Sequence, residues 1–208
     1  MRKNKNISKP KKPVFSFVAD GKCEFWYLQL LRQYEGLYIY LEPELPQKKK
    51  LQNQYDLVET LSEESEKVFW IIDFDTILKE TRETPKGNKT PLQDFYELYK
   101  KSKKNKKVVV IVNNPCFEYW LLLHFEQTSK YFPTGEKLEK QLKKYLKDYE
   151  KTQKYYKNYR QNIYQKLKPN LPFAISNAEK LGEFDFTNTA TGMSEMDEIF
   201  RELNIPKM

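Results

Sequence analysis

Two aspartates, one residue apart, follow an apolar run in this sequence. Residues 68–72 (VFWII) are β-branched and aromatic, which is typical of a strand covered on both faces. An open parallel sheet binds ligands beyond the carboxyl ends of its strands, and Asp73 falls at such an end. If the chain stays extended, Asp75 projects to the same face as Asp73. Aspartate also commonly caps the helix or turn after a strand, so a structural role for Asp73 remains an alternative.

A third carboxylate, that of Asp20, follows another predicted strand, residues 14–19 (VFSFVA). Neighbouring strands lie about 4.8 Å apart, so Asp20 and Asp73 could bracket one metal ion if their strands are adjacent. Carboxylates gathered without a cation raise one another's pKa, so such a site implies a divalent metal. We predict Asp20, Asp73 and Asp75 as ligands of Mg²⁺, with Mn²⁺ as the alternative, because these ions prefer oxygen ligands. The metal would activate a water, stabilise the leaving oxygen, or do both.

Alternating strands and helices in the first half of the chain would position these carboxylates. A helix is predicted at 22–35, ended by Gly36, and another begins with Thr90 as its cap and Pro91 at its first position. The polar stretch 43–67 is predicted to be a crossover with a helix around 55–65. Strands are predicted at 14–19, 37–42, 68–72 and 108–112. This pattern predicts an α/β fold with a mostly parallel four-stranded sheet flanked by helices.

The second half of the sequence is predicted to be helical, with no strand after residue 113. Helical segments are predicted at 115–127, as one long Lys/Tyr-rich region at 134–168, and at 172–181 and 193–203. The predicted organisation is a disordered basic arm at 1–13, an α/β core at 14–114 and a C-terminal helical lobe at 115–208 packed on that core.

Composition favours a cytoplasmic protein with a polyanionic partner. The 208 residues carry a net charge of +8, and a basic surface releases counterions when it neutralises phosphates. Most basic residues are lysines, a bias that AT-rich codon usage would also produce. Cys23 and Cys116 lie far apart, so a disulfide framework or a zinc site is not predicted. The basic N-terminus has no apolar stretch behind it, and no segment has the roughly 20 apolar residues of a membrane span.

Three stretches in order resemble the RloB-like proteins: FVADGKCEFWYLQLL (17–31), VFWIIDFD (68–75) and VVVIVNNPCFEYWLLLHF (108–125). The resemblance implies a Toprim-like fold, related to OLD-type nucleases, and a metal-dependent module that cleaves nucleic acid. Toprim domains place a glutamate after the first strand and an Asp-x-Asp after the third, which Asp73 and Asp75 match. In the first motif Gly21 and Glu24 match the family, whereas Asp20 replaces a glutamate and Cys23 replaces a threonine.

The aspartate at position 20 puts activity in doubt, because its side chain is one methylene shorter than glutamate. Glu24, in the first turn of the following helix, could compensate, or it could be an ordinary charge at a helix N-terminus. Glu118 is a candidate further acid, or else part of a buried network with His124. The lone His124 is interpreted as structural. The predicted catalytic residues are thus Asp20, Glu24, Asp73, Asp75 and Glu118.

Lysines and tyrosines alternate in residues 143–166. They could form stacking platforms interleaved with phosphate contacts, as in proteins that bind single-stranded or structured RNA. Alternatively, the tyrosines pack on the sheet and the lysines are solvated, which we favour for most of these tyrosines. The residues predicted to contact nucleic acid are Lys22, Lys143, Lys144, Lys147, Lys154 and Lys157.

The leading hypothesis is a magnesium-dependent phosphodiesterase, a DNA or RNA endonuclease that acts as the effector of an anti-phage or abortive-infection system. The resemblance also implies an AAA-type or SMC-like ATPase partner. The alternative is a catalytically degenerate subunit that binds or senses nucleic acid, motivated by Asp20. A haloacid-dehalogenase-like phosphatase is disfavoured, because the threonine of DFDTI falls one position early and the motif follows the third strand instead of the first. DNA and RNA, including tRNA, all stay open as substrates.

Overall fold

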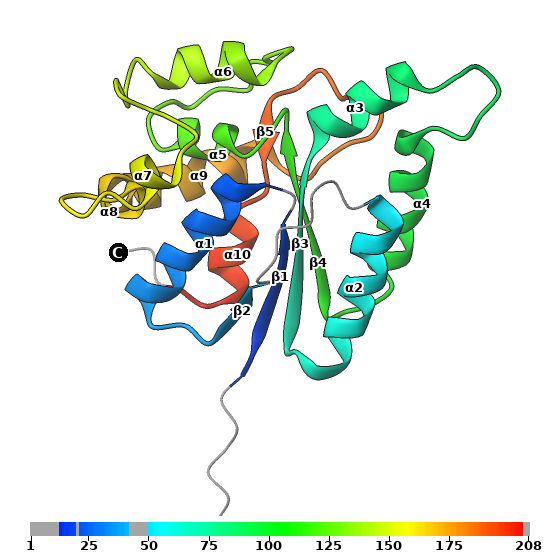
Figure 1. Ribbon diagram of the computed structural model, residues 1–208, viewed down its shortest axis with the longest axis horizontal. Helices are drawn as coiled ribbons and strands as arrows, with labels where there is room; N and C mark the ends of the chain where they lie inside the picture. The colour runs from blue at the N-terminus through cyan, green and yellow to red at the C-terminus, as the bar shows by residue number, and fades with distance from the viewer. Residues whose placement is uncertain (1–12, 20, 42–49, 206–208) are drawn as a thin grey trace, which may run out of the picture.

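The computed structural model describes residues 13–19, 21–41 and 50–205. In this part of the chain one five-stranded sheet has the order β2-β1-β3-β4-β5 (Figure 1). The first four strands are parallel, and β5 is antiparallel to β4. The strands are β1 (Phe15–Ala19), β2 (Ile39–Leu41), β3 (Lys67–Asp73), β4 (Val108–Asn114) and β5 (Met193–Ser194). The predicted α/β class with a mostly parallel sheet is confirmed, with one more strand than expected.

Strand order places the carboxyl ends of β1 and β3 side by side. β1 pairs with both β2 and β3, and Ala19 lies opposite Ile71 in the register of β1 and β3. The assumption that the first and third strands are neighbours is therefore correct. The chain leaves β1 toward β2 on one side and later returns to β3 on the other. This reversal of strand order is a topological switch point, where α/β sheets bind ligands.

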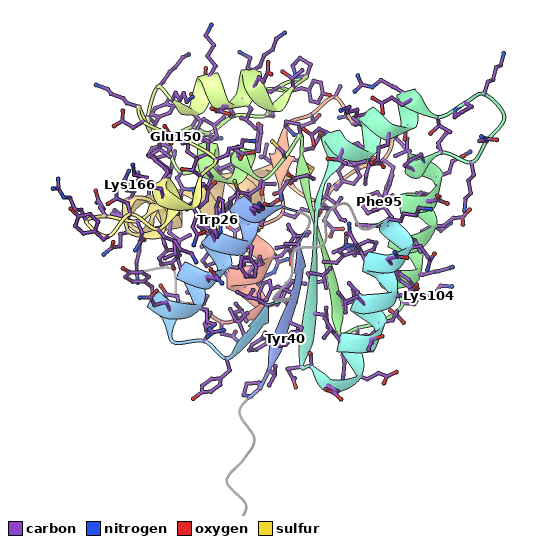
Figure 2. All side chains as sticks on the ribbon, viewed as in Figure 1. Trp26, Tyr40, Phe95, Lys104, Glu150 and Lys166 are labelled. Carbon is purple, nitrogen blue, oxygen red and sulfur yellow. The ribbon has the colours of Figure 1, made fainter. Side chains whose placement is uncertain are left out.

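Helices cover both faces of the sheet. Figure 1 shows α1 (Lys22–Glu35) and α10 (Asp197–Glu202) on one side, and α2 (Leu51–Glu64) and α4 (Pro91–Ser102) on the other. Successive side chains of β3 alternate between two hydrophobic clusters: Phe69 joins the α1 cluster and Trp70 joins the α2/α4 cluster. This alternation explains why the whole β3 run is apolar. Phe95, labelled on α4 in Figure 2, packs against Trp70 with ring centroids 6.0 Å apart.

The helix boundaries predicted from caps in the first half are confirmed. α1 spans Lys22–Glu35, and Gly36 follows in the left-handed conformation at φ 63°, which glycine adopts without a steric penalty. Thr90 and Gln93 form a capping box at the start of α4. α2 begins at Leu51, ahead of the predicted residue 55.

The long helical region predicted at 134–168 is wrong in its continuity. It consists of α6 (Gly135–Leu142), α7 (Gln153–Tyr156) and α8 (Ile163–Leu167). Each of these helices starts anew because a cap residue, Thr134, Thr152 or Asn162, accepts a hydrogen bond from a backbone N–H of the first turn. The helix predicted at 115–127 is likewise shorter, α5 (Glu118–Leu123).

The prediction that no strand follows residue 113 is also wrong. Residues 193–194, expected to begin a helix, pair with Asn114 and Asn113 as β5. Side chains of β4 hold this segment: the Asn113 Oδ1 accepts from the Ser194 Oγ at 2.6 Å, and the Asn114 Nδ2 donates to carbonyls at Thr189 and Thr191. α9 (Leu171–Leu181) precedes β5, after the short 3-10 helix η1 (Lys168–Asn170).

The second half packs around α1. Trp26, labelled on α1 in Figure 2, lies toward the lobe helices and contacts Tyr156 of α7, with ring centroids 5.5 Å apart. One hydrophobic cluster joins α1 to α5, α9 and α10. In the described part of the chain, no helix has the length and apolar character needed to cross a bilayer. Residues 1–12, most of the predicted basic arm, lie outside the described residues, so that arm stays a prediction.

Candidate active site at the carboxyl edge of the sheet

Asp73 ends β3 and joins it to the loop after β4. Its Oδ1 accepts a hydrogen bond from the backbone N–H of Phe117 at 2.8 Å. The aspartate occupies the N-cap position of α3 (Phe74–Glu83), but its side chain makes no capping hydrogen bond to that helix. The capping role considered for Asp73 is therefore wrong. The carboxylate instead fixes the β3 edge to the segment that carries Glu118.

Asp75 lies in the first turn of α3, so the expectation that an extended chain aligns it with Asp73 is wrong. The chain turns at Phe74, which is fully buried against Phe95 and Phe184 and draws the chain into a helix. The backbone N–H of Asp75 donates to the Pro115 carbonyl at 2.9 Å. Two links, through Asp73 and Asp75, thus tie the end of β3 to the end of β4.

Burial raises the pKa of Asp75, and the negative charge of Glu118 raises it further. The backbone N–H of Thr76 and the Lys151 ammonium act in the opposite direction without cancelling the shift. A raised carboxyl pKa next to another carboxylate is the property expected of acidic groups that gather where a cation can bind.

Glu118, the first residue of α5, is a buried carboxylate with partners on both oxygens. Its Oε1 accepts from the Tyr149 hydroxyl at 2.8 Å, and its Oε2 accepts from the Cys116 thiol at 3.0 Å. The Lys151 ammonium pairs with Oε2 at 2.9 Å. Glu118 is 2% exposed, whereas the Lys151 side chain is 42% exposed, so the ion pair connects the interior to solvent. Burial acts to lower the pKa of Lys151, but Glu118 raises it overall.

Two tyrosines and two thiols extend this network toward α1. The hydroxyls of Tyr149 and Tyr156 lie 2.7 Å apart. Burial and the Glu118 charge raise the pKa of Cys23 to about 12, and the same causes raise that of Cys116. Both cysteines therefore remain neutral thiols near pH 7, which argues against either one as a nucleophile.

Gly135 leaves open the space in which Asp75, Cys116 and Lys151 meet. A methyl group on Gly135 would contact the Cys116 Sγ at 3.7 Å, and the Asp75 Oδ2 and Lys151 Nζ at 3.9 Å each. Gly135 begins α6, near the top of Figure 1. The site thus combines the β3–α3 junction, the segment after β4 and two parts of the lobe.

Glu24 lies at the start of α1, and its carboxylate folds back over Gly21. A Cβ on Gly21 would lie 2.2 Å from the Glu24 Oε2, so a larger residue at position 21 would displace the Glu24 carboxylate. Glu24 is 2% exposed, which differs from an ordinary solvated charge at a helix end. Its charge contributes to the raised pKa of Cys23. Asp20, the predicted first-strand ligand, lies outside the described residues.

His124 lies apart from the Glu118 network. Its Nδ1 hydrogen-bonds to the Trp120 carbonyl at 3.0 Å, and burial lowers its pKa to about 4, so the ring is neutral. The rings of His124 and Trp120 contact each other, with centroids 4.8 Å apart. The structural interpretation of His124 agrees with this packing, although the expected network shared with Glu118 does not form.

The predicted nucleic-acid lysines, Lys22, Lys143, Lys144, Lys147, Lys154 and Lys157, are all exposed. The breaks between α6, α7 and α8 distribute them over separate segments instead of one helix face. Lys143 pairs with Glu139 at 2.8 Å. Most tyrosines of this region are buried, as expected, namely Tyr149, Tyr155, Tyr156 and Tyr164.

The described residues contain no group of three or more His, Cys, Asp or Glu side chains arranged to hold a metal ion. The predicted trio includes Asp20, so the trio itself stays a prediction. Mg²⁺ is usually held by only one or two carboxylates together with waters and substrate phosphate. Asp73 and Asp75 are two carboxylates of this type, one at the end of β3 and one in the first turn of α3, and both oxygens of Glu118 are held by other side chains.

A cavity of about 410 Å³ opens beside Asp73, between the start of α2 and α3. Lys50 and Lys79 contribute positive charge to its lining, and Glu80 and Glu83 contribute negative charge. The cavity gives a ligand access to the β3 end from the α2 face of the sheet.

Lys151, Tyr149 and Tyr156 are the site residues that the sequence did not single out. They lie in a run with many lysines and tyrosines, where residue type alone distinguishes none of them. For Cys116, the sequence predicted only that it belongs to no disulfide framework or zinc site and that it lies in the 108–125 stretch. Its position two residues before Glu118 was the available indication of its role.

Comparison with curated proteins and with solved structures found no match. The family model described as "RloB-like protein" matches residues 15–203. This match spans β1 through α10 and includes every described site residue. The chain therefore belongs to the RloB-like protein family.

Proposed function

We propose that this RloB-like protein is a metal-dependent phosphodiesterase that cleaves nucleic acid, with Asp73 and Asp75 as two of its Mg²⁺ ligands. The observation that carries the proposal is the half-buried Asp75, two residues after Asp73 at the topological switch point, with its pKa raised by partial burial and by Glu118. Asp20 follows the adjacent strand β1 in the sequence and is proposed as a third ligand. The net charge of +8 suits a phosphate-rich substrate.

The side chains around the carboxylates have separable roles in this proposal. Bound Mg²⁺ would supply Lewis-acid activation of water and of the leaving oxygen. Lys151 would bind a substrate phosphate, because its ammonium is partly exposed and lies beside Asp75 at Gly135. Glu118 would position Lys151, and Tyr149 would position Glu118. Glu118 thus moves from predicted catalytic acid to positioning residue.

The biological role is proposed from the family resemblance. RloB-like proteins are encoded in restriction loci and beside AAA-type or SMC-like ATPases, so the chain would act as an anti-phage effector that such an ATPase restrains or triggers. DNA and RNA are both candidate substrates.

The test is cleavage by the purified full chain of plasmid, single-stranded DNA and tRNA, with Mg²⁺ or with a chelator. Asp73→Asn is the informative variant, because the amide oxygen can still accept from the Phe117 N–H while the charge is lost. Asp56→Asn is the matched control, since Asp56 is exposed on α2. We expect Mg²⁺-dependent cleavage that Asp73→Asn removes and Asp56→Asn retains. Cleavage that survives Asp73→Asn would refute the site.

A second candidate function is a catalytically silent subunit that binds or senses nucleic acid. The Lys151 ammonium, which already neutralises Glu118, favours this alternative. So does the aspartate at position 20, where the family has glutamate. Calorimetric titration with Mg²⁺ separates the two candidates. No heat of Mg²⁺ binding, together with steeply salt-dependent nucleic-acid binding, would favour the silent subunit. Cleavage gained by Asp20→Glu would attribute the silence to that position.

A further inference from the structure

A cavity of about 670 Å³ lies along α1, away from the carboxylate site. The second half of α1 forms one wall, and the segment from Lys157 to Gln165 forms the other. Its volume is within the roughly 300–1,000 Å³ typical of small-ligand pockets. Of its lining residues, only Lys157 is among the predicted nucleic-acid contacts.

The charge of the cavity, which we call the α1 cavity, suits a phosphate. Arg32 and Lys157 line it, and none of its lining residues in the described chain is acidic. Arg32 is steadied by a hydrogen bond from its Nη1 to the Ile39 carbonyl at 3.4 Å. Because no carboxylate in the lining neutralises Arg32 or Lys157, the cavity has a local excess of positive charge. Contacts to a phosphate require such an excess.

Tyr159 gives the α1 cavity an exposed aromatic face. It is 87% exposed, whereas Tyr38, the next most exposed large hydrophobic residue of the described chain, is 53% exposed. The Arg160 Nε donates to the Tyr159 hydroxyl at 2.9 Å, and the guanidinium carbon lies 5.6 Å from the ring centroid. An aromatic ring beside a guanidinium, both open to solvent, is the arrangement on which bases of single strands stack.

An unused acceptor lies in the wall of the cavity. The Gln29 Oε1 is buried and accepts no hydrogen bond from any residue that the structure describes. That oxygen is not open to the cavity, so the polar contacts for a base come from the other lining amides. The amides of Gln33 and Asn158 also line the cavity.

The opposite wall is held in place before any ligand binds. Asn162 and Gln165 form a capping box at the start of α8, and the Asn162 Nδ2 donates to the Tyr34 hydroxyl at 2.8 Å. The Tyr34 ring stacks on Tyr164 with centroids 5.6 Å apart. These contacts join α1 to α8 across the cavity, so its shape does not depend on ordering by a ligand.

We propose that the α1 cavity is a subsite for one nucleotide of a single-stranded nucleic acid, with the base stacked on Tyr159 and its phosphate near Arg32 and Lys157. This inference rests on the proposed nucleic-acid function and adds the form of the substrate. Arg32 is eight residues beyond Glu24 on α1, roughly 12 Å along the helix at 1.5 Å per residue. A strand held at the cavity would therefore pass along α1 to the carboxylate edge.

The test measures binding of labelled oligonucleotides to the full chain by fluorescence anisotropy, with a chelator present so that cleavage cannot occur. Tyr159→Ala should weaken single-strand binding about 5- to 100-fold, the usual range for loss of one stacked base. Tyr159→Phe should stay close to wild type. Lys157→Gln should weaken binding and reduce the salt dependence by about one counterion.

Tyr96→Ala is the matched control. Tyr96 is 45% exposed on α4 and also has a cation over its ring, the Lys100 Nζ at 4.9 Å. Equal effects of Tyr159→Ala and Tyr96→Ala would overturn the subsite. Two results would overturn the assignment of the α1 cavity to a single strand. One is a free mononucleotide that competes as well as the oligonucleotide, and the other is a chain that binds duplex more tightly than single strands.

Failure of the subsite and failure of the phosphodiesterase give different results. Cleavage by a chain whose single-strand affinity is unchanged by Tyr159→Ala overturns the subsite and leaves the enzyme intact. Tyr159-dependent binding without any cleavage by the wild type supports the subsite and overturns the enzyme.

Discussion

Two buried glutamates flank the end of β4, and they are held in opposite ways. Side chains hold Glu118: a tyrosine hydroxyl, a thiol and the ammonium of Lys151. Backbone N–H groups hold Glu195, from Val112 to its Oε2 and from Phe184 to its Oε1, each at 2.8 Å. Backbone donors cannot leave without unfolding the segment, whereas a half-exposed lysine can exchange a carboxylate for a phosphate. Glu195 is therefore a structural clamp, and Glu118 is suited to function.

The same difference appears in the settings of the two residues. Glu195 fastens the β5 segment and the loop after α9 to the sheet. Glu118 lies beside Asp75 and raises its pKa. The hydrogen bonds that the Glu195 carboxyl group accepts maintain the fold, whereas the charge of Glu118 raises the pKa of neighbouring ionisable groups.

Removal of the Glu195 side chain should have the largest effect on stability. Glu195→Ala leaves two buried N–H groups without acceptors, which costs about 2–6 kcal/mol at about 1–3 kcal/mol each. Urea unfolding of the full chain measures the loss. Glu63→Ala, an exposed change on α2, is the control and should stay within about 0.5 kcal/mol of wild type. Equal stability of the two variants would end the description of Glu195 as a clamp.

Replacing Glu118 or Glu195 with glutamine tests whether the two residues differ in function as well as in their hydrogen-bond partners. Both Glu118→Gln and Glu195→Gln should lower the free energy of unfolding by about 1–3 kcal/mol, because an amide NH₂ then faces a donor or an ammonium. Only Glu118→Gln should also reduce cleavage, by about tenfold or more, because Lys151 loses its positioning partner. Cleavage assays on the two variants, matched for folded fraction, measure the difference. A parallel loss of cleavage in both would contradict the functional distinction.

Lys151→Met tests the link between the ion pair and the site. Loss of the ammonium should destabilise the chain by about 1–2 kcal/mol, a value reduced for the partial exposure of Lys151. The pKa of Asp75 should rise further, because Lys151 acts to lower it in the wild type. Carbon-detected NMR titration of the Asp75 carboxyl measures the shift. Lys151→Arg retains a positive charge, so the rise in the Asp75 pKa should be smaller in that variant. An unchanged Asp75 pKa in Lys151→Met would show that Asp75 is not coupled to the Glu118 network.

The pH dependence of stability tests the buried carboxyl group of Glu195. Burial raises the pKa of Glu195 from 4.5 to about 7, against the two N–H donors that favour the carboxylate. The folded state then binds the Glu195 proton more tightly than the unfolded state, so this stabilisation is full below about pH 4.5 and is lost as pH rises to about 7. Between pH 5 and 8 the wild type should lose about 2–3 kcal/mol relative to Glu195→Gln, measured by thermal unfolding. A constant difference across that range would contradict the raised pKa.

Local chemistry was sufficient to predict the four parallel strands, α1 and the start of α4, but α3 (Phe74–Glu83) was not predicted. The bounds of α1 follow from Gly36, which alone takes the left-handed conformation there without strain, and the start of α4 follows from Thr90 and Pro91. The apolar runs of β3 and β4 predict strands covered on both faces. Asp73 and Asp75 were identified for the same reason, since the run ahead of them places them at a strand end.

The sequence by itself determined the α/β pattern, the helix caps and the presence of acidic residues at strand ends, because each depends on neighbours a few positions away. Only the tertiary structure decided that β5 completes the sheet and that Lys151 and Tyr149 neutralise and hold Glu118, more than thirty residues earlier. These contacts join segments distant in the chain. Their partners are selected by burial and by the need to satisfy buried charge, and no short stretch of residues encodes that selection.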